Sequence, residues 1–554
     1  MTKQVQELDH VIIRFAGDSG DGMQLTGDRF TQETAVFGND LSTLPNFPAE
    51  IRAPAGTLPG VSSFQLHFAD HDILTPGDAP DVLVAMNPAA LKANLKDLPR
   101  GTDLIINTDE FTKRNLQKVG YEKNPLEDGS LSAWHLHAVP LTSLTVKALE
   151  DQAISRKDAE RAKNMFALGM LSWLYGRGAE GTLSFLEQKF GKKPEIYKAN
   201  VTAFQAGWNF GETTEAFSVR YEVKPAALKP GRYRNITGNS ALAVTTTSGP
   251  GMLLKAETVG LAVSVELPML IIDVQRAGPS TGMPTKTEQA DLLMAMYGRN
   301  GESPVPIVAA MSPSDCFHAA IEAARIALTY RTPVILLSDG YLANGSEPWL
   351  IPEVASLPDL SAAFEFATVE THVNGDGEFQ PFKRDPQTLA RPWAIPGTAG
   401  LEHRIGGIEK ADGTGAISYD PDNHDLMVRA RQAKVDGITV PDLEVDDPDG
   451  DAKVLVLGWG LTYGSIGAAV RRTRKAGLKV AQAHLRHMNP FPANLGEVLH
   501  RYDKVLVPEI NLGQLALLLR GKYLVDVISY NRVRGLPFQA AELASVIEEV
   551  IGNA

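Results

Sequence analysis

Met269-Leu270-Ile271-Ile272-Asp273-Val274 is a short apolar run, and the polar stretch Gln275-Arg276-Ala277-Gly278-Pro279-Ser280-Thr281-Gly282 follows it. A run of this length, bounded by glycine and proline, is typical of a buried strand. A second strand, expected at 241–246, ends in Thr245-Thr246-Thr247-Ser248-Gly249-Pro250-Gly251, and a helix-like stretch comes after it. Both strands therefore end in polar groups. Ligands bind at the carboxyl ends of strands in open α/β sheets, so a binding site is expected where these two turns meet.

Apolar runs and amphipathic stretches alternate along most of the chain, which predicts an α/β fold with mostly parallel sheets. With 554 residues the chain is too long for one hydrophobic core. We expect three α/β domains, at 1–212, 213–440 and 441–554. Residues 351–450 are rich in proline, glycine and aspartate, which predicts a long irregular loop inside the middle domain.

The composition excludes several classes of function. The net charge is −13, so binding to a phosphate backbone is not expected. One cysteine, Cys316, cannot supply the four thiolates that an iron–sulfur cluster normally needs. The chain has no secretory signal and no apolar run of membrane-spanning length. We therefore expect a cytoplasmic protein that binds neither nucleic acid nor membranes.

Arg276 is the only guanidinium in the two polar turns. Its planar fork can donate two parallel hydrogen bonds to a carboxylate, which suits an anionic substrate. A structural ion pair is the alternative reading of the same residue.

A glycine-rich turn follows the first predicted strand, with Gly17, Gly20 and Gly22 at its corners. A strand that leads through such a turn into a helix presents backbone N–H groups to a phosphate, as in a nucleotide or coenzyme A. The spacing differs from the dinucleotide-binding pattern, and no Walker lysine follows. A tight turn that binds nothing is the alternative.

The two polar turns, together with the stretches 286–302, 337–341, 389–394 and 400–404, resemble the pyrimidine-binding domain of 2-oxoacid:ferredoxin oxidoreductases. The order of motifs is similar to the 2-oxoglutarate-type alpha subunit, in which a gamma-like domain is fused at the N-terminus. The stretch 508–514 resembles that family's transketolase-C-like domain. The resemblance implies three domains: gamma-like, pyrimidine-binding-type and transketolase-C-like.

In this family two subunits share one thiamine diphosphate, and the resemblance implies conversion of 2-oxoglutarate and coenzyme A to succinyl-CoA and carbon dioxide, with reduction of ferredoxin. It implies an alpha2beta2 heterotetramer whose beta subunit holds Mg²⁺ and a [4Fe–4S] cluster. By carry-over, Arg276, Ser280 and Thr281 would bind substrate. Thr247, Ser248 and Gly249 would lie near the aminopyrimidine, and the turn with Gly17, Gly20 and Gly22 would be the candidate coenzyme A site.

One departure from the family is large. A Tyr-Pro-Ile-Thr-Pro motif and a later glutamate that hydrogen-bonds the aminopyrimidine are both absent, so no catalytic residue is assigned. The pattern on both sides indicates a gap near Ala243 and Val244. Glu257 and Glu266 lie beyond the Thr-Ser-Gly-Pro-Gly motif and do not replace that glutamate. Two alternatives stay open: another 2-oxoacid such as pyruvate as substrate, or an inactive structural subunit if the segment is truly missing.

Overall fold

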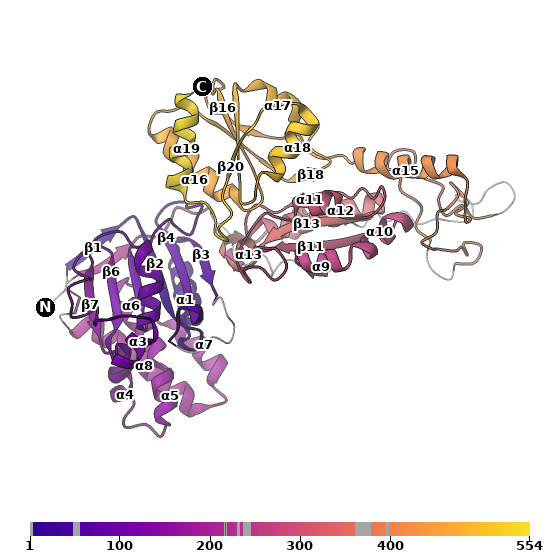
Figure 1. The fold of residues 1–554 in the computed structure, drawn as a ribbon. Helices are drawn as coiled ribbons and strands as arrows, with labels where there is room; N and C mark the ends of the chain where they lie inside the picture. The colour runs from indigo at the N-terminus through magenta and orange to yellow at the C-terminus, as the bar shows by residue number, and fades with distance from the viewer. Residues whose placement is uncertain are drawn as a thin grey trace. The chain divides into compact units, whose positions relative to one another are not determined.

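The computed structural model describes residues 4–47, 56–214, 216–217, 219–229, 233–236, 245–360, 378–394 and 398–553. The chain forms two compact units (Figure 1): Met1–Ile236 with Gly345–Ile351, and Thr237–Asn344 with Pro352–Ala554. The join expected near Ala243 and Val244 lies outside the described residues.

A six-stranded sheet of order β3-β4-β2-β5-β6-β7 organises the first unit. Its parallel part matches the predicted alternation and consists of β2 (His10–Asp18), β5 (Val82–Ala85), β6 (Asp103–Asn107) and β7 (His135–Val139). Two antiparallel strands that the sequence analysis did not assign extend it, β3 (Asp40–Asn46) and β4 (Val61–Ala69). The sheet is therefore mixed, with four of its six strands in the expected parallel arrangement.

Four long helices pack with this sheet: α1 (Met23–Phe37), α6 (Lys163–Leu174), α7 (Glu180–Phe190) and α8 (Pro194–Thr213). The predicted helices at 163–173 and 183–190 are α6 and α7. Helices α6 and α8 cross at two glycines, because a β-carbon on Gly169 would overlap the carbonyl oxygen of Phe204 and one on Gly207 would overlap that of Phe166. Because neither glycine has a side chain, the two backbones can come into contact at this crossing.

Shorter elements complete the first unit. They are α2 (Pro88–Asn94), α3 (Lys113–Lys118), α4 (Leu141–Ala148), α5 (Arg156–Arg161), a parallel pair β1 (Gln4–Leu8) with β8 (Val219–Val223), and an antiparallel pair β9 (Tyr233–Ile236) with β14 (Glu347–Leu350).

The second unit contains two five-stranded sheets. The first has the order β10-β11-β13-β12-β18. Its parallel strands are β10 (Thr245–Thr247), β11 (Met269–Gln275), β13 (Pro333–Asp339) and β12 (Ile307–Ala309). The fifth strand, β18 (His487–Asn489), comes from the C-terminal part of the chain and pairs antiparallel to β12. Its helices are α9 (Gly249–Leu254), α10 (Ala256–Val265), α11 (Leu292–Tyr297), α12 (Asp315–Tyr330) and α13 (Gly340–Asn344).

The second sheet of this unit has the order β15-β17-β16-β19-β20. It consists of β15 (Val445–Asp446), β17 (Ala481–Leu485), β16 (Val454–Trp459), β19 (Lys504–Glu509) and β20 (Ile528–Asn531), with β15 alone antiparallel. Its helices are α16 (Thr462–Lys475), α17 (Leu495–Arg501), α18 (Gln514–Tyr523) and α19 (Ala540–Gly552). Buried side chains of the two sheets share hydrophobic cores.

The composition predicts a long irregular loop at 351–450. Part of this stretch is helical instead. A 16-residue helix, α15 (Pro421–Asp436), lies within it, and Asp420 caps its start by accepting from the N–H of Asp422. Among the described residues, no helix is long and apolar enough to cross a membrane.

Candidate active site

The two polar turns lie at one edge of the β10–β11 pair. These strands run parallel, and Thr247 pairs in register with Asp273. The carboxyl ends of both strands therefore point the same way, and the turn after each one begins at the same edge of the sheet. The structure thus brings Thr247, Ser248 and Gly249 to the edge where Arg276 begins the second turn, as the motifs led us to expect.

Gly249 is held in a confined space at the start of α9. It is buried, and a β-carbon at this position would lie 2.7 Å from both carboxyl oxygens of Asp291. A β-carbon on Gly251 would overlap the hydroxyl oxygen of Thr247. Both glycines are therefore required by packing, and the backbone of the turn can be approached closely.

Arg276 carries a donor that the described residues leave unpaired. Its side chain is half-buried, and its Nε atom is buried with no hydrogen-bond partner in the part of the chain that the structure describes. No ion pair joins its guanidinium to any residue in the part of the chain that the structure describes. An unpartnered guanidinium at this depth is costly, which favours a bound carboxylate over the structural reading.

Ser280 and Thr281 belong to the same turn but are exposed. The turn closes through the N–H of Met283, which donates to the carbonyl of Ala277 at 3.0 Å, and Ser280 has a left-handed φ of 55°. The two hydroxyl residues therefore stand on the solvent side of the loop, while Arg276 stands at its base.

Three acidic side chains beside the two turns were not singled out from the sequence. Asp273 is 0% exposed, and burial together with the nearby Asp291 raises its pKa well above the usual value. Burial and the Glu288 carboxylate raise the pKa of Asp291 to about 6, although Arg276 lowers it. Burial also raises the pKa of Glu288, which accepts from the N–H of Gly278 at 3.2 Å. Asp273 is a charged residue inside the apolar run 269–274, and this feature of the sequence could have indicated a functional role for it.

The stretch after these turns is locked onto the C-terminal sheet. Gln289 donates to the carbonyl of Trp459 at 2.7 Å and accepts from the N–H of Ile510 at 3.0 Å. Gln514 donates to the carbonyl of Ala290 at 2.7 Å. Two motifs that lie far apart in the sequence, at 286–292 and at 508–514, therefore form one hydrogen-bonded junction.

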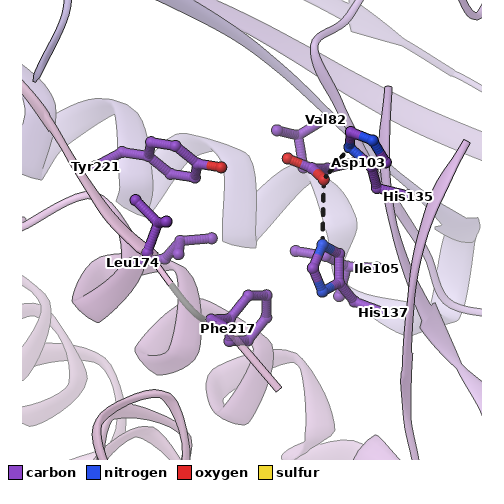
Figure 2. Close-up of a pocket in the computed structure, with 9 residues that line it drawn as sticks. Val82, Asp103, Ile105, His135, His137, Leu174, Phe217 and Tyr221 are labelled. Carbon is purple, nitrogen blue, oxygen red and sulfur yellow. Dashed lines mark hydrogen bonds and ion pairs between the residues drawn. The ribbon is translucent and has the colours of Figure 1, made fainter. Parts of the chain in front are cut away.

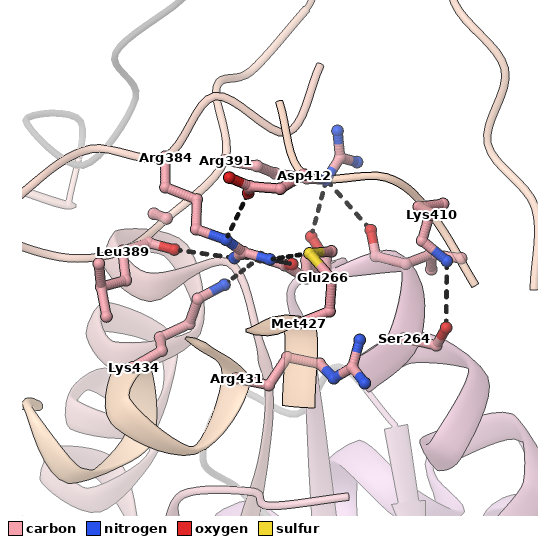
Figure 3. A network of polar contacts seen from close by, with 12 residues as sticks. Ser264, Glu266, Arg384, Leu389, Arg391, Lys410, Asp412, Met427, Arg431 and Lys434 are labelled. Carbon is pink, nitrogen blue, oxygen red and sulfur yellow. Dashed lines mark hydrogen bonds and ion pairs between the residues drawn. The ribbon is translucent and has the colours of Figure 1, made fainter. Parts of the chain in front are cut away.

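Glu266 lies at the end of α10 in a buried ion cluster. Figure 3 shows it at the centre of a network of cations. Arg384 donates to its carboxylate at 2.6 Å, and Lys434 forms a second buried ion pair with it. Although burial opposes this, Lys434 and Arg384 hold the pKa of Glu266 below its usual value. Burial lowers the pKa of Lys434 to about 8. The cluster ties α15 and the 378–391 segment to the end of α10, whereas Glu257 is exposed.

The glycine-rich turn of the first unit carries its own carboxylates. The N–H of Asp18 donates to Asp21 at 2.8 Å, and Asp21 forms an ion pair with Lys163 at 3.0 Å. Gly22 begins α1 with a left-handed φ of 75°, and no side chain caps this helix. A β-carbon on Gly20 would meet nothing within 4 Å, so the turn is open at that corner.

A separate cavity of about 200 Å³ lies in the first unit beside β5, β6 and β7. Figure 2 shows one carboxyl oxygen of Asp103 between two imidazoles. It lies 3.1 Å from Nε2 of His137 and 3.4 Å from Nδ1 of His135, and Nδ1 of His137 lies 3.0 Å from the carbonyl of Ala216. Although burial opposes it, the contacts with Asp103 and Ala216 raise the pKa of His137. Phe217 stacks on the imidazole at 4.9 Å.

A mostly parallel α/β sheet with a Thr-Ser-Gly turn and a half-buried arginine at its carboxyl edge is the arrangement of a ligand-binding protein of the α/β class. Two family matches agree with this. Residues 236–419 match the family described as "Pyruvate flavodoxin/ferredoxin oxidoreductase, thiamine diP-bdg". Residues 12–210 match "Pyruvate ferredoxin/flavodoxin oxidoreductase".

Individual relatives narrow the class. The "2-oxoglutarate oxidoreductase subunit KorA" of Mycobacterium tuberculosis is 59% identical, over 99% of this chain and 92% of the relative. The "2-oxoglutarate synthase subunit KorA" of Methanothermobacter marburgensis is 32% identical, over 49% of this chain and 70% of the relative. The solved "2-oxoglutarate:ferredoxin oxidoreductase from Magnetococcus marinus with 2-oxoglutarate, coenzyme A and succinyl-CoA bound" is 27% identical with a TM-score of 0.81, and the match covers 98% of this chain and 100% of that one.

The chain belongs to the 2-oxoacid:ferredoxin oxidoreductase family, as an alpha subunit of the 2-oxoglutarate oxidoreductase type. The alignment with the Mycobacterium relative runs over 613 positions. Because this chain has only 554 residues, at least 59 of those positions, the difference between the two numbers, have no counterpart here.

Proposed function

We propose that this chain acts with a beta subunit to convert 2-oxoglutarate and coenzyme A to succinyl-CoA and carbon dioxide, with electrons passing to ferredoxin. The unpartnered guanidinium of Arg276 is the observation that carries the proposal, because each 2-oxoacid substrate brings a carboxylate that it can hold. The 59% identity to a 2-oxoglutarate oxidoreductase subunit supports the choice of substrate.

Thr247, Ser248 and Gly249 would hold the aminopyrimidine of thiamine diphosphate. The two hydroxyls of Thr247 and Ser248 at the carboxyl edge of the sheet support this, because they can hydrogen-bond to the nitrogens of the ring. When bound, the cofactor supplies the carbon nucleophile and electron sink that decarboxylation of a 2-oxoacid requires. The contribution of this chain is to orient the ring, bind the substrate and exclude water.

Arg276 would bind the carboxylate of the substrate, with Ser280 and Thr281 at the mouth of the same turn. In the first unit, the uncapped start of α1 and the open corner at Gly20 support coenzyme A at the turn of Gly17, Gly20 and Gly22. The carboxylate of Asp21 there is paired with Lys163, and burial and the Asp21 charge raise the pKa of the neighbouring Asp18.

The beta subunit would hold Mg²⁺ and the [4Fe–4S] cluster, and an alpha2beta2 assembly in the cytoplasm would donate electrons to ferredoxin. The single cysteine of this chain supports this division, since Cys316 is buried and a cluster needs several thiolates. We propose the same three domains as the sequence analysis, 1–212, 213–440 and 441–554, as the functional divisions of the chain.

One observation favours a second candidate, an inactive structural subunit. At least 59 positions of the Mycobacterium relative have no counterpart here. We propose that they belong near Ala243 and Val244, just before β10. In support, β10 is the outer strand of its sheet, and Thr245 and Thr246 are exposed. If the cellular protein lacks this segment, it also lacks the family glutamate that activates thiamine.

Co-expression with the beta subunit tests the proposal. The complex is expected to reduce ferredoxin only when both 2-oxoglutarate and coenzyme A are present, and pyruvate is the comparison substrate. A higher rate with pyruvate would mean that pyruvate, rather than 2-oxoglutarate, is the preferred substrate. A folded complex that is inactive with every 2-oxoacid would favour the structural subunit. The intact mass of the purified alpha subunit, against 59.8 kDa for this sequence, shows whether the segment is present.

A further inference from the structure

Two buried carboxyl groups at the candidate active site have no hydrogen-bond partners. Both side-chain oxygens of Asp273 and the Oδ2 atom of Asp291 are buried without a donor in the described part of the chain. Buried polar atoms are nearly always paired, and an isolated ionised carboxylate is among the most costly groups to bury. These three oxygens therefore require an explanation.

Their positions place them between the two turns that form the site. Asp273 pairs in register with Thr247, and Asp291 lies against Gly249. The main-chain N–H of Asp291 donates to the side chain of Gln275 at 3.1 Å, and that side chain donates in turn to the carbonyl of Ser338. Asp291 is thus fixed at the end of β11, on the cofactor-binding turn and near Arg276.

The charges around this pair are mostly negative. Glu288 raises the pKa of Asp291 and Arg276 lowers it. Asp339, at the end of β13, keeps three donors of its own, and burial lowers the pKa of Lys286. The neighbouring elements β10 and α9 carry no titratable side chain. Burial and the charge of Asp291 both raise the pKa of Asp273, so the two carboxyls do not both ionise readily.

We propose that Asp273 and Asp291 share one proton, and that this proton leaves Arg276 available for the carboxylate of the 2-oxoacid. The first half rests on the unpartnered oxygens and on the place of the two side chains at the adjoining turns. The second half rests on the proposed function. With both carboxyls ionised, Asp291 would attract the guanidinium of Arg276, and an anionic substrate would enter a site with excess negative charge. Both aspartates are therefore positioning residues.

Infrared pH titration of the full chain tests the shared proton without activity. The wild type is expected to show the carbonyl stretch of a protonated carboxyl at neutral pH, and the band is expected to vanish on alkalinisation. Asp291→Asn removes the neighbouring charge but leaves Asp273 buried, so the band is expected to vanish at a lower pH than in the wild type. Asp273→Asn leaves only the half-buried Asp291 and is expected to lose the band at neutral pH. Asp442→Asn, at an exposed site, is the control and should retain it.

Steady-state kinetics of the complex with its beta subunit test the link to Arg276. In the wild type, KM for 2-oxoglutarate is expected to rise by up to about tenfold per pH unit above the upper pKa of the pair, while kcat changes less. Asp291→Asn imitates the protonated pair at every pH, so its KM is expected to stay constant over the same range. A residue that only supports the fold would not make KM independent of pH.

The outcomes are separable. If the wild type lacks the carboxyl band, or if both single Asn variants keep it with an unchanged pH dependence, the shared proton is overturned, whatever the activity. If the band behaves as expected but KM follows the same pH curve in wild type and Asp291→Asn, the link to Arg276 is overturned. If Asp291→Asn does not fold, the infrared titrations of Asp273→Asn and of the wild type decide whether the proton is shared. A complex without 2-oxoglutarate activity contradicts the proposed function and leaves the infrared result to decide the first half.

Discussion

The carboxyl oxygens of Asp291 lie 2.7 Å from the point where a β-carbon on Gly249 would stand. Gly249 begins the helix that follows the Thr-Ser-Gly turn, and Asp291 lies about forty residues further along the chain. The contact therefore joins the two motifs that define the family, and a single methyl group would disturb it.

Gly249→Ala is expected to displace Asp291 and to weaken thiamine diphosphate binding. Overpacking of this kind typically costs about 1–3 kcal/mol. Gly260→Ala in α10 is the matched control, because its β-carbon would meet only Asn300 at 3.9 Å. Cofactor affinity and thermal unfolding of both variants check this. Equal behaviour of the two variants would show that the turn has more space than the structure gives it.

Glu266→Gln is expected to loosen residues 378–436. Removing one partner from a buried ion cluster typically costs about 3–5 kcal/mol, because the remaining charges of Arg384 and Lys434 stay buried. Hydrogen exchange of peptides from α15 is the measurement, and Glu257→Gln, at an exposed glutamate on α10, is the control. Unchanged hydrogen exchange in α15 would show that Glu266 does not anchor this helix.

The same cluster predicts a response to acid. The folded-state pKa of Glu266 is lowered below 4.5, so its contribution to stability is fully present above pH 4.5. It is lost as the pH falls through the lowered pKa. Exchange in α15 should therefore rise in acid in the wild type and rise less in Glu266→Gln.

His137 predicts the opposite trend in the first unit. Its folded-state pKa is raised above 6.5, so the ion pair with Asp103 stabilises fully below pH 6.5 and is lost as the pH rises through the raised value. Asp103→Asn should lower the melting temperature at pH 6 more than at pH 9. Asp128→Asn, at an exposed site in the same unit, gives the baseline. A pH-independent effect of Asp103→Asn would contradict the protonated state of His137.

The crossing of α6 and α8 depends on glycine. Gly169→Ala would place a methyl group on the carbonyl oxygen of Phe204, and a cost of about 1–3 kcal/mol is expected. Gly521→Ala, in a helix where the β-carbon would meet nothing, should instead be neutral or stabilising by up to about 1 kcal/mol. Chemical denaturation of the two variants measures the difference. A loss no larger for Gly169→Ala than for Gly521→Ala would contradict the tight crossing.

Local patterns in the sequence were enough to predict most of the central strands. The apolar runs at 269–274 and 333–338 became β11 and β13 within one residue at each end, because a buried parallel strand is continuous in hydrophobicity. The helix at 421–436 was missed, since its apolar face is narrow and glycine, proline and aspartate surround it. Strands β3 and β4 were missed because they mix polar and apolar residues.

The candidate site was only half visible in the sequence. Motif resemblance indicated Thr247, Ser248, Gly249 and Arg276, which lie close together in the chain. The partners Asp273 and Asp291 were not singled out, because their importance comes from burial and mutual distance rather than from any motif. Ser280 and Thr281 were proposed for the same pocket and stand on the exposed side of its loop.

The most direct test of the account is kcat/KM for 2-oxoglutarate in the complex of Arg276→Ala with the beta subunit. Loss of a bidentate, desolvated carboxylate partner should cost on the order of 2–5 kcal/mol, which is a fall of roughly 30-fold or more. Arg276→Lys should recover only part of this, since it keeps the charge but loses the fork. The control is Arg429→Ala, at an exposed arginine that pairs with Asp425. A value for Arg276→Ala equal to that of the wild type would contradict the account and make Arg276 a structural residue.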